Sequence, residues 1–275
     1  IWIDAASTLR LDKSSLIVLD PVNRERIEEF VNNGGRLFVG GNCTVSLMLM
    51  AVAGLINTEL VEWISSTTFQ AASGAGAAQM RELIAQMHAL GAIDLNKEDD
   101  VLLLDQAVKY TQNDPKFPIQ SIGFPLAGSL VPWIDKVVEA GQTREEWKAM
   151  VECNKILGRD DDQLPIDGTC VRIGAMRCHS QALTIKLKEK LTVKQIEGYI
   201  KSGTSWTKLV SNTEFDTKAQ LTPASVSGTL DIAVGRVRHL CMGEDFVNLF
   251  TVGDQLLWGA AEPLRRMLNI IRKKI

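Results

Sequence analysis

The sequence predicts an α/β front part followed by an α+β region that holds a large mixed or antiparallel sheet. Strand-like, helical and strand-like segments alternate within the first 40 residues, which is typical of a parallel α/β unit. Further along, residues 168–191 alternate apolar and polar side chains, which predicts two strands, or one long strand, with a half-exposed face. The 275 residues are enough for one large domain or two modest ones.

The front unit is expected to contain three buried strands and one amphipathic helix. The strands are placed at residues 1–6, 16–19 and 36–39, and the helix at residues 23–32. The sequence Asn33-Gly34-Gly35 is expected to end that helix. The turn Gly40-Gly41-Asn42-Cys43-Thr44 then leads into an apolar helix over residues 45–52.

The elements that follow are predicted from periodicity, capping and turn residues. Strands are expected at residues 60–69, 235–240 and 248–251, and helices at 77–90, 99–110, 143–157, 192–201 and 254–273. Thr143 and Glu146 have the spacing of a capping box at the start of the helix predicted over residues 143–157. Residues 115–132 are rich in Gly and Pro, so they predict a long loop that is functional or covers an interface.

Composition excludes several classes of protein. The formal net charge is −3 with both signs interspersed, so no basic face for nucleic acid is predicted, and Arg272-Lys273-Lys274 is expected to be a solvated helix end. No run of about 18 apolar residues predicts a membrane span. Five scattered cysteines without a CxxC pair indicate free thiols in a reducing cytoplasm, and no metal site is predicted.

Cys43 is the candidate nucleophile. It stands at the junction of a predicted strand and a predicted helix, where unpaired N–H groups and the helix dipole favour a thiolate of lowered pKa. Gly40 and Gly41 let the backbone turn sharply and leave space for a substrate. The alternative is a buried, inert cysteine at the start of an apolar helix.

His179 is the candidate acid/base among three histidines. It lies in a polar break between two apolar strand segments, a plausible cleft edge, where an imidazole of near-neutral pKa relays protons. Its neighbour Cys178 is expected on the opposite face of the strand. His88 is expected on a helix surface, and His239 is expected to be structural.

Two arginines are candidates for binding an anion. Arg172 lies in an apolar strand and Arg10 follows the first predicted strand, and a partly buried guanidinium matches a carboxylate or phosphate. An internal salt bridge is the equal alternative for both. Lys148, on a charged helix, is on its own expected to belong to a solvated face.

Four strings together resemble the bacterial aspartate-semialdehyde dehydrogenases of the Gram-negative type. They are residues 40–47 (GGNCTVSL), 70–74 (QAASG), 171–181 (VRIGAMRCHSQ) and 250–266 (FTVGDQLLWGAAEPLRR). The resemblance covers essentially the whole chain and preserves the order of the strings. It implies a fold like that of glyceraldehyde-3-phosphate dehydrogenase, in which a Rossmann-like NADP-binding domain joins a catalytic and dimerisation domain whose large mixed sheet is flanked by helices.

The resemblance also implies roles for individual residues. The catalytic residues that it implies are Cys43 as nucleophile, His179 as acid/base and Gln70, which orients the reacting group. The substrate-binding residues that it implies are Arg10, Asn42 and Lys148 for phosphate, Arg172 for the α-carboxylate and Glu145 for the amino group. Ser73, Gly74 and Gln255 match positions near the nicotinamide end of NADP.

The reaction implied is the NADPH-dependent reductive dephosphorylation of L-aspartyl 4-phosphate, in lysine, threonine and methionine biosynthesis, by a homodimer. One departure is evident, because the Gly-rich NADP fingerprint that opens the family is not found. We therefore expect residues 1–41 and 262–275 to be a remnant of the NADP-binding domain, residues 42–261 to be the catalytic and dimerisation domain, and the chain alone to turn over weakly or not at all.

Three other functions remain open from the residues. A cysteine hydrolase or acyl transferase using Cys43 and His179 predicts a buried acid or amide that orients the histidine, without nicotinamide. A dimerisation or small-molecule-binding module predicts binding without turnover. A sister acyl-phosphate reductase, such as an N-acetyl-glutamyl-phosphate reductase, shares the chemistry but is not expected to match the four strings so closely.

Overall fold

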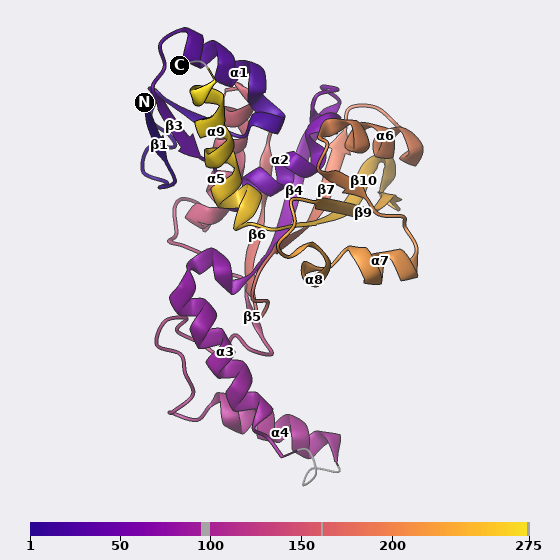
Figure 1. Ribbon diagram of the computed structural model, residues 1–275. Coiled ribbons are helices and arrows are strands. Elements are labelled where there is room, and N and C mark those ends of the chain that lie inside the picture. Colours follow the sequence, from indigo (N-terminus) through magenta and orange to yellow (C-terminus); the bar gives the residue numbers. More distant parts are fainter. Residues whose placement is uncertain (95–99, 161, 274–275) are drawn as a thin grey trace.

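The chain folds into two sheets and a projecting helical arm (Figure 1). The computed structural model describes residues 1–94, 100–160 and 162–273. The predicted helix residue Asp99, Lys274 of the basic cluster and the last two positions of the 262–275 remnant lie outside the described residues.

The smaller sheet has three parallel strands in the order β1-β3-β2. β1 (Trp2–Asp4), β2 (Ser15–Val18), α1 (Asp20–Asn32) and β3 (Leu37–Gly40) follow the predicted strand and helix order. The helix α9 (Glu262–Arg272) returns from the end of the chain to pack on this sheet, where it buries Met267, Ile270 and Ile271. Residues from both ends of the chain therefore share one small apolar core. The prediction that residues 1–41 and 262–275 form one unit requires such a core, but the boundaries of that unit at residues 41 and 262 stay a prediction.

The larger sheet is mixed and has seven strands in the order β5-β6-β4-β7-β10-β9-β8. The strands are β4 (Val61–Gln70), β5 (Leu130–Val131), β6 (Ile166–Ile173), β7 (His179–Leu187), β8 (Thr207–Leu209), β9 (Ile232–Leu240) and β10 (Gly243–Gly253). β4 and β6 are parallel, as are β8 and β9, and the other neighbours are antiparallel. The segment predicted as one or two strands is thus two, β6 and β7.

Three helices, α2 (Cys43–Ile56), α5 (Arg144–Leu157) and α6 (Val193–Gly203), pack against the large sheet. α2 is apolar almost all round, and its side chains form the centre of the largest core cluster. Gly54 lets α2 approach α6 closely, because a Cβ there would lie 1.9 Å from the carbonyl oxygen of Tyr199. This packing fixes the start of α2, where Cys43 lies.

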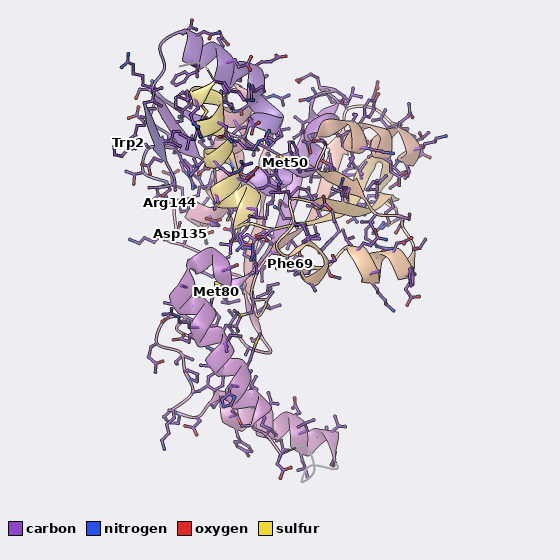
Figure 2. The ribbon with its side chains drawn as sticks, in the orientation of Figure 1. Trp2, Met50, Phe69, Met80, Asp135 and Arg144 are labelled. Carbon is purple, nitrogen blue, oxygen red and sulfur yellow. The ribbon has the colours of Figure 1, made fainter. Side chains whose placement is uncertain are left out.

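The helices α3 (Ala77–Gly91) and α4 (Val101–Gln112) form an arm that extends away from both sheets (Figure 1). Met80, labelled in Figure 2, marks the part of the arm that is nearest the sheets. The predicted long loop folds back along α3, where Gln86 accepts hydrogen bonds from the backbone of Leu126 and Ala127 at 2.7 and 2.9 Å. The loop is therefore held both by side-chain bonds to its backbone and by a small apolar cluster that its Leu126 forms with Leu83 of α3.

One arginine ties the two sheets together. Arg266, on α9, binds Asp20 at the start of α1 through two hydrogen bonds of 2.6 Å each. Its guanidinium also lies over the rings of Trp206 and Trp258, 4.7 and 5.7 Å from their centroids. Because this guanidinium is paired with a carboxylate along one edge and stacked on aromatic rings with its face, it links the two sheets rigidly.

Several elements differ from the prediction. The strand β8 and the short helices α7 (Glu214–Gln220) and α8 (Pro223–Val226) were not predicted. The single helix predicted over residues 254–273 is wrong in its first part, because a π-helical turn, η2 (Leu257–Ala261), precedes α9. A short 3-10 turn, η1 (Ala72–Ala75), was also not predicted. Both turns border the cavity described below.

None of the helices in the described ranges combines the length and apolar character that a membrane crossing needs. Nor do three or more His, Cys, Asp or Glu side chains in the described part of the chain gather as metal ligands.

Candidate active site

A cavity of about 600 Å³ lies where the two sheets meet. It collects residues from the end of β3, the start of α2, the ends of β4 and β6, one face of α5 and the turn η2. Ten of the eleven residues singled out from the sequence line it. The exception is His179, which lies directly behind Gly74.

Cys43 is the first residue of α2, as predicted, and is half-buried in the cavity wall. Asn42 caps the helix, since its Oδ1 accepts the N–H groups of Thr44 and Val45 at 2.9 and 3.3 Å. The cap leaves the sulfur beside the helix start but uses two of the free N–H groups that the prediction relied on.

The predicted lowering of the Cys43 pKa is wrong for the free chain. Burial, followed by the negative charge of Glu145, raises the pKa of the thiol to about 12, although Arg10 and Arg172 act in the opposite direction. The thiol is therefore protonated near neutral pH.

We expect alkylation of Cys43 by iodoacetamide to accelerate about tenfold per pH unit from pH 7 to pH 10, because only the thiolate reacts and its fraction grows tenfold per unit below the pKa. Mass spectrometry of the Cys43 peptide, in a Cys241→Ser background that removes the exposed cysteine, measures the rate. A rate that levels off near pH 7 would contradict the raised pKa.

His179 is buried, and its ring is held by the backbone. Nδ1 accepts the N–H of Ala71 at 3.1 Å, so the neutral ring carries its proton on Nε2. Burial and the charge of Arg172 lower the pKa of His179 to about 3, so the expectation of a near-neutral pKa is wrong. Nε2 is buried and has no hydrogen-bond partner among the described residues, which leaves one N–H unused beside Gly74.

Gly74 separates His179 from the open cavity. A Cβ on Gly74 would lie 2.9 Å from Nε2 of His179 and 3.0 Å from Nη1 of Arg172. A glycine is therefore needed here, because any larger residue would press on both polar groups. Cys178, next to His179, is buried instead in an apolar cluster with Val210 and Val252. It precedes β7 and has a φ of 74°, so the expected alternation of strand faces does not apply to it.

Arg172 reaches the cavity from β6. Its Nη1 donates to the carbonyl oxygen of Ala71 at 2.7 Å, and only 8% of the residue is exposed. Burial lowers its pKa, yet no carboxylate of the described chain lies within 4.0 Å of it. The alternative of an internal salt bridge is therefore wrong for Arg172, and a partly satisfied guanidinium lines the cavity.

Lys148 and Glu145 form an ion pair on the cavity face of α5. Nζ of Lys148 lies 3.1 Å from Glu145 and 3.0 Å from Asp135, and it is largely buried, so the expected solvated face is wrong. Burial opposes its charge, but Glu145 and Asp135 outweigh burial and raise its pKa. Figure 2 labels Asp135 near Arg144, where α5 begins.

Glu145 also binds neutral groups of the site. It accepts Nδ2 of Asn42 at 2.8 Å and Nε2 of Gln70 at 3.4 Å. It thereby connects the residue before Cys43 with the end of β4.

Arg10 has the internal salt bridge that was the alternative for it, and it lines the cavity as well. Its Nε donates to the carbonyl oxygen of Gly40 at 2.7 Å, and its Nη1 lies 3.2 Å from Glu152. Glu152 was missed from the sequence, although it continues the helical spacing of Glu145 and Lys148.

Gln255 joins Ser73 to the residue that precedes β7 and His179. Its Oε1 accepts the N–H of Cys178 at 2.8 Å, and its Nε2 donates to Oγ of Ser73. Gly259, also missed, lets η2 pack closely against Cys43, because a Cβ there would lie 2.6 Å from Cβ of Cys43. The other histidines are as predicted: His88 is exposed and His239 binds the carbonyl oxygen of Leu191.

The comparisons with known proteins agree with this geometry. The family model of the semialdehyde dehydrogenase dimerisation domain matches residues 52–258. The aspartate semialdehyde dehydrogenase of Francisella tularensis is 51% identical, covers 99% of this chain and 74% of its own, and superposes with a TM-score of 0.95.

Two more distant structures are similar as well. Aspartate semialdehyde dehydrogenase II of Vibrio cholerae, solved with ASA, is 25% identical over 98% of this chain and 72% of its own, with a TM-score of 0.80. The Candida albicans enzyme, solved with NADP, is 15% identical over 98% of this chain and 70% of its own, with a TM-score of 0.65, and shows the shared fold alone.

Fold and family model together define a semialdehyde dehydrogenase. Within that class, the chain belongs to the aspartate-semialdehyde dehydrogenase family. The resemblance of the four strings is thus confirmed, and so is the mixed sheet flanked by helices. The remnant of an NADP-binding domain stays a prediction.

Proposed function

We propose that this chain performs the NADPH-dependent reductive dephosphorylation of L-aspartyl 4-phosphate to L-aspartate 4-semialdehyde, with Cys43 as nucleophile. The observation that carries the proposal is one cavity that brings together a cysteine at a helix start, an unpaired buried arginine and a lysine–carboxylate pair. These groups match a substrate with an acyl carbon, two anionic ends and an ammonium group.

The substrate is bound at its charged groups. Arg172 would take the α-carboxylate and Glu145 the ammonium group, while Arg10, Asn42 and Lys148 would surround the phosphate. Glu145 is one cause of the raised Cys43 pKa, so an ammonium group beside it offsets that effect. We therefore expect the thiol to ionise more readily once the substrate is bound.

The covalent steps use Cys43 and His179. The thiolate attacks the acyl carbon, the bond to the phosphate oxygen breaks, and phosphate leaves a thioester on Cys43. After reduction of that carbon, the thiohemiacetal collapses, the carbon–sulfur bond breaks and the thiolate is restored. On this proposal the unused Nε2–H of His179, which lies behind Gly74, would come within reach of the negative oxygen that develops and donate to it, and Gln70 would help to orient the reacting group.

NADP fits the side of the cavity formed by Ser73, Gly74 and Gln255. Gly74 has no side chain, so a flat ring could lie against it beside His179 and Arg172. Bound NADPH would supply the hydride that reduces the thioester carbon. We also infer a homodimer, since the matched family model is a dimerisation domain, and a cytoplasmic location, which five free cysteines favour.

The cysteine-hydrolase alternative has less support. It requires an acid or amide on Nδ1 of the histidine, whereas Nδ1 of His179 accepts a backbone N–H from Ala71. A sister acyl-phosphate reductase is disfavoured by the 51% identity to an aspartate semialdehyde dehydrogenase.

Phosphate-dependent reduction of NADP with aspartate semialdehyde tests the proposal. We expect Arg172→Lys to raise the KM for the semialdehyde about tenfold or more, because the planar fork that grips a carboxylate is lost. The KM for phosphate should change less than about twofold. Arg238→Lys, on the exposed edge of β9, is the matched control. An unaltered KM for the semialdehyde would refute the carboxylate clamp, and ester hydrolysis without nucleotide would favour the hydrolase.

A further inference from the structure

One face of α5 carries three charged residues into the cavity region. Glu145, Lys148 and Glu152 are spaced by three and four positions, so they lie along the same side of the helix. Glu145 and Lys148 line the cavity itself. Glu152 lies behind it, only 2% exposed, and the proposed chemistry assigns it no part.

Glu152 binds two groups that border the reacting atoms. Its Oε2 accepts the backbone N–H of Asn42 at 2.7 Å, on the residue before Cys43. Its Oε1 lies 3.2 Å from Nη1 of Arg10. One buried carboxylate therefore holds both the turn that carries the nucleophile and an arginine of the cavity wall.

The bonds made by Arg10 leave part of its guanidinium unused. Nε is occupied by the carbonyl oxygen of Gly40 and Nη1 by Glu152, whereas Nη2 has no acceptor among the residues that the structure describes. Arg10 lines the cavity, so its remaining N–H groups are available to an anion there. Without Glu152, the guanidinium would be held by the single bond to Gly40.

We propose that Glu152 is a positioning residue that fixes Arg10 for phosphate and, through the N–H of Asn42, sets the turn that carries Cys43. The inference rests on the proposed function, because it needs a phosphate subsite at Arg10. A charged acceptor suits this place, since it balances the guanidinium in a buried setting. Burial raises the pKa of Glu152, while Arg10 and the N–H of Asn42 oppose that change.

The test measures binding of inorganic phosphate to the chain by titration calorimetry, together with the separate KM values for phosphate and semialdehyde. Glu152→Gln removes the charge and sets an amide donor against Arg10 or Asn42. We expect it to weaken phosphate binding about tenfold or more, and to leave the KM for the semialdehyde within about twofold. Glu152→Asp, which keeps the charge, should recover part of the loss.

Glu146→Gln is the matched control. Glu146 lies on the same helix, is 9% exposed and accepts two backbone N–H groups, but these come from Thr143 and Cys170 rather than from Arg10 and Asn42. Its substitution should lower the melting temperature without changing the affinity for phosphate. The same comparison applies to Glu152→Asp and Glu146→Asp if the glutamine variants do not fold.

Combination with Arg10→Lys shows whether Glu152 acts through Arg10. In the double variant Glu152→Gln should add less than about a threefold loss, because the group that it positions is already altered. Equal phosphate affinity in Glu152→Gln and the unaltered chain, or fully additive losses in the double variant, would overturn the inference alone. Absence of phosphate binding by the unaltered chain would overturn the phosphate subsite and the inference with it.

Discussion

Cys43→Ser is expected to reduce phosphate-dependent turnover of aspartate semialdehyde by about a thousandfold or more, which corresponds to an increase of about 4 kcal/mol or more in the activation free energy. A serine hydroxyl at the start of α2 would be far less ionised than the thiol, and burial already disfavours the anion there. The substitution changes one atom in the wall of the cavity, so substrate binding should be retained. Single-turnover measurements would separate the lost acyl-enzyme step from binding.

Cys241→Ser is the control for this substitution. Cys241 is exposed in the turn between β9 and β10 and is not among the cavity residues. Its replacement should leave turnover unchanged. The Cys43→Ser and Cys241→Ser variants should have the same melting temperature within a few degrees. If Cys43→Ser keeps more than about a tenth of the activity, Cys43 is not the nucleophile.

Local sequence predicted where the nucleophile lies but not how it ionises. The Gly40–Thr44 turn and the apolar run after it place Cys43 at a helix start because both signals are local. The pKa depends instead on burial and on Glu145, which lies 102 positions further along the chain and reaches Asn42 only in the folded state. The same holds for His179, whose proton is fixed on Nε2 by the N–H of Ala71.

The missed elements are those whose signals are weak or long-range. β8 has three residues and, within the described part of the chain, pairs with β9 alone. Its alternation of apolar and polar side chains is therefore too short to predict a strand. The turn η2 was read as part of a regular helix, because a π-helical turn has no periodicity of its own in five residues. Glu152 had a local signal, its helical spacing from Lys148, but that spacing alone equally predicts a solvated face.

Gly259→Ala is expected to lower kcat about 10- to 100-fold, since a displacement of about 1 Å at a reacting group costs about that much. A Cβ at residue 259 would lie 2.6 Å from Cβ and 2.9 Å from Cα of Cys43, and 3.2 Å from Cβ of Gln255. Two of these neighbours cannot rotate away, because they belong to the backbone of α2 or are attached directly to it. Either η2 or the start of α2 must shift, and both carry residues of the cavity wall.

Gly198→Ala separates this steric effect from the general consequences of replacing a helical glycine. Gly198 lies inside α6, and a Cβ there would meet nothing within 4 Å, so alanine should stabilise the helix by about 0.5–1 kcal/mol and leave kcat unchanged. Circular dichroism and urea unfolding of both variants would show that each is folded at assay temperature. If folded Gly259→Ala keeps kcat within about twofold, the start of α2 tolerates displacement and tight packing of η2 on Cys43 has no part in catalysis.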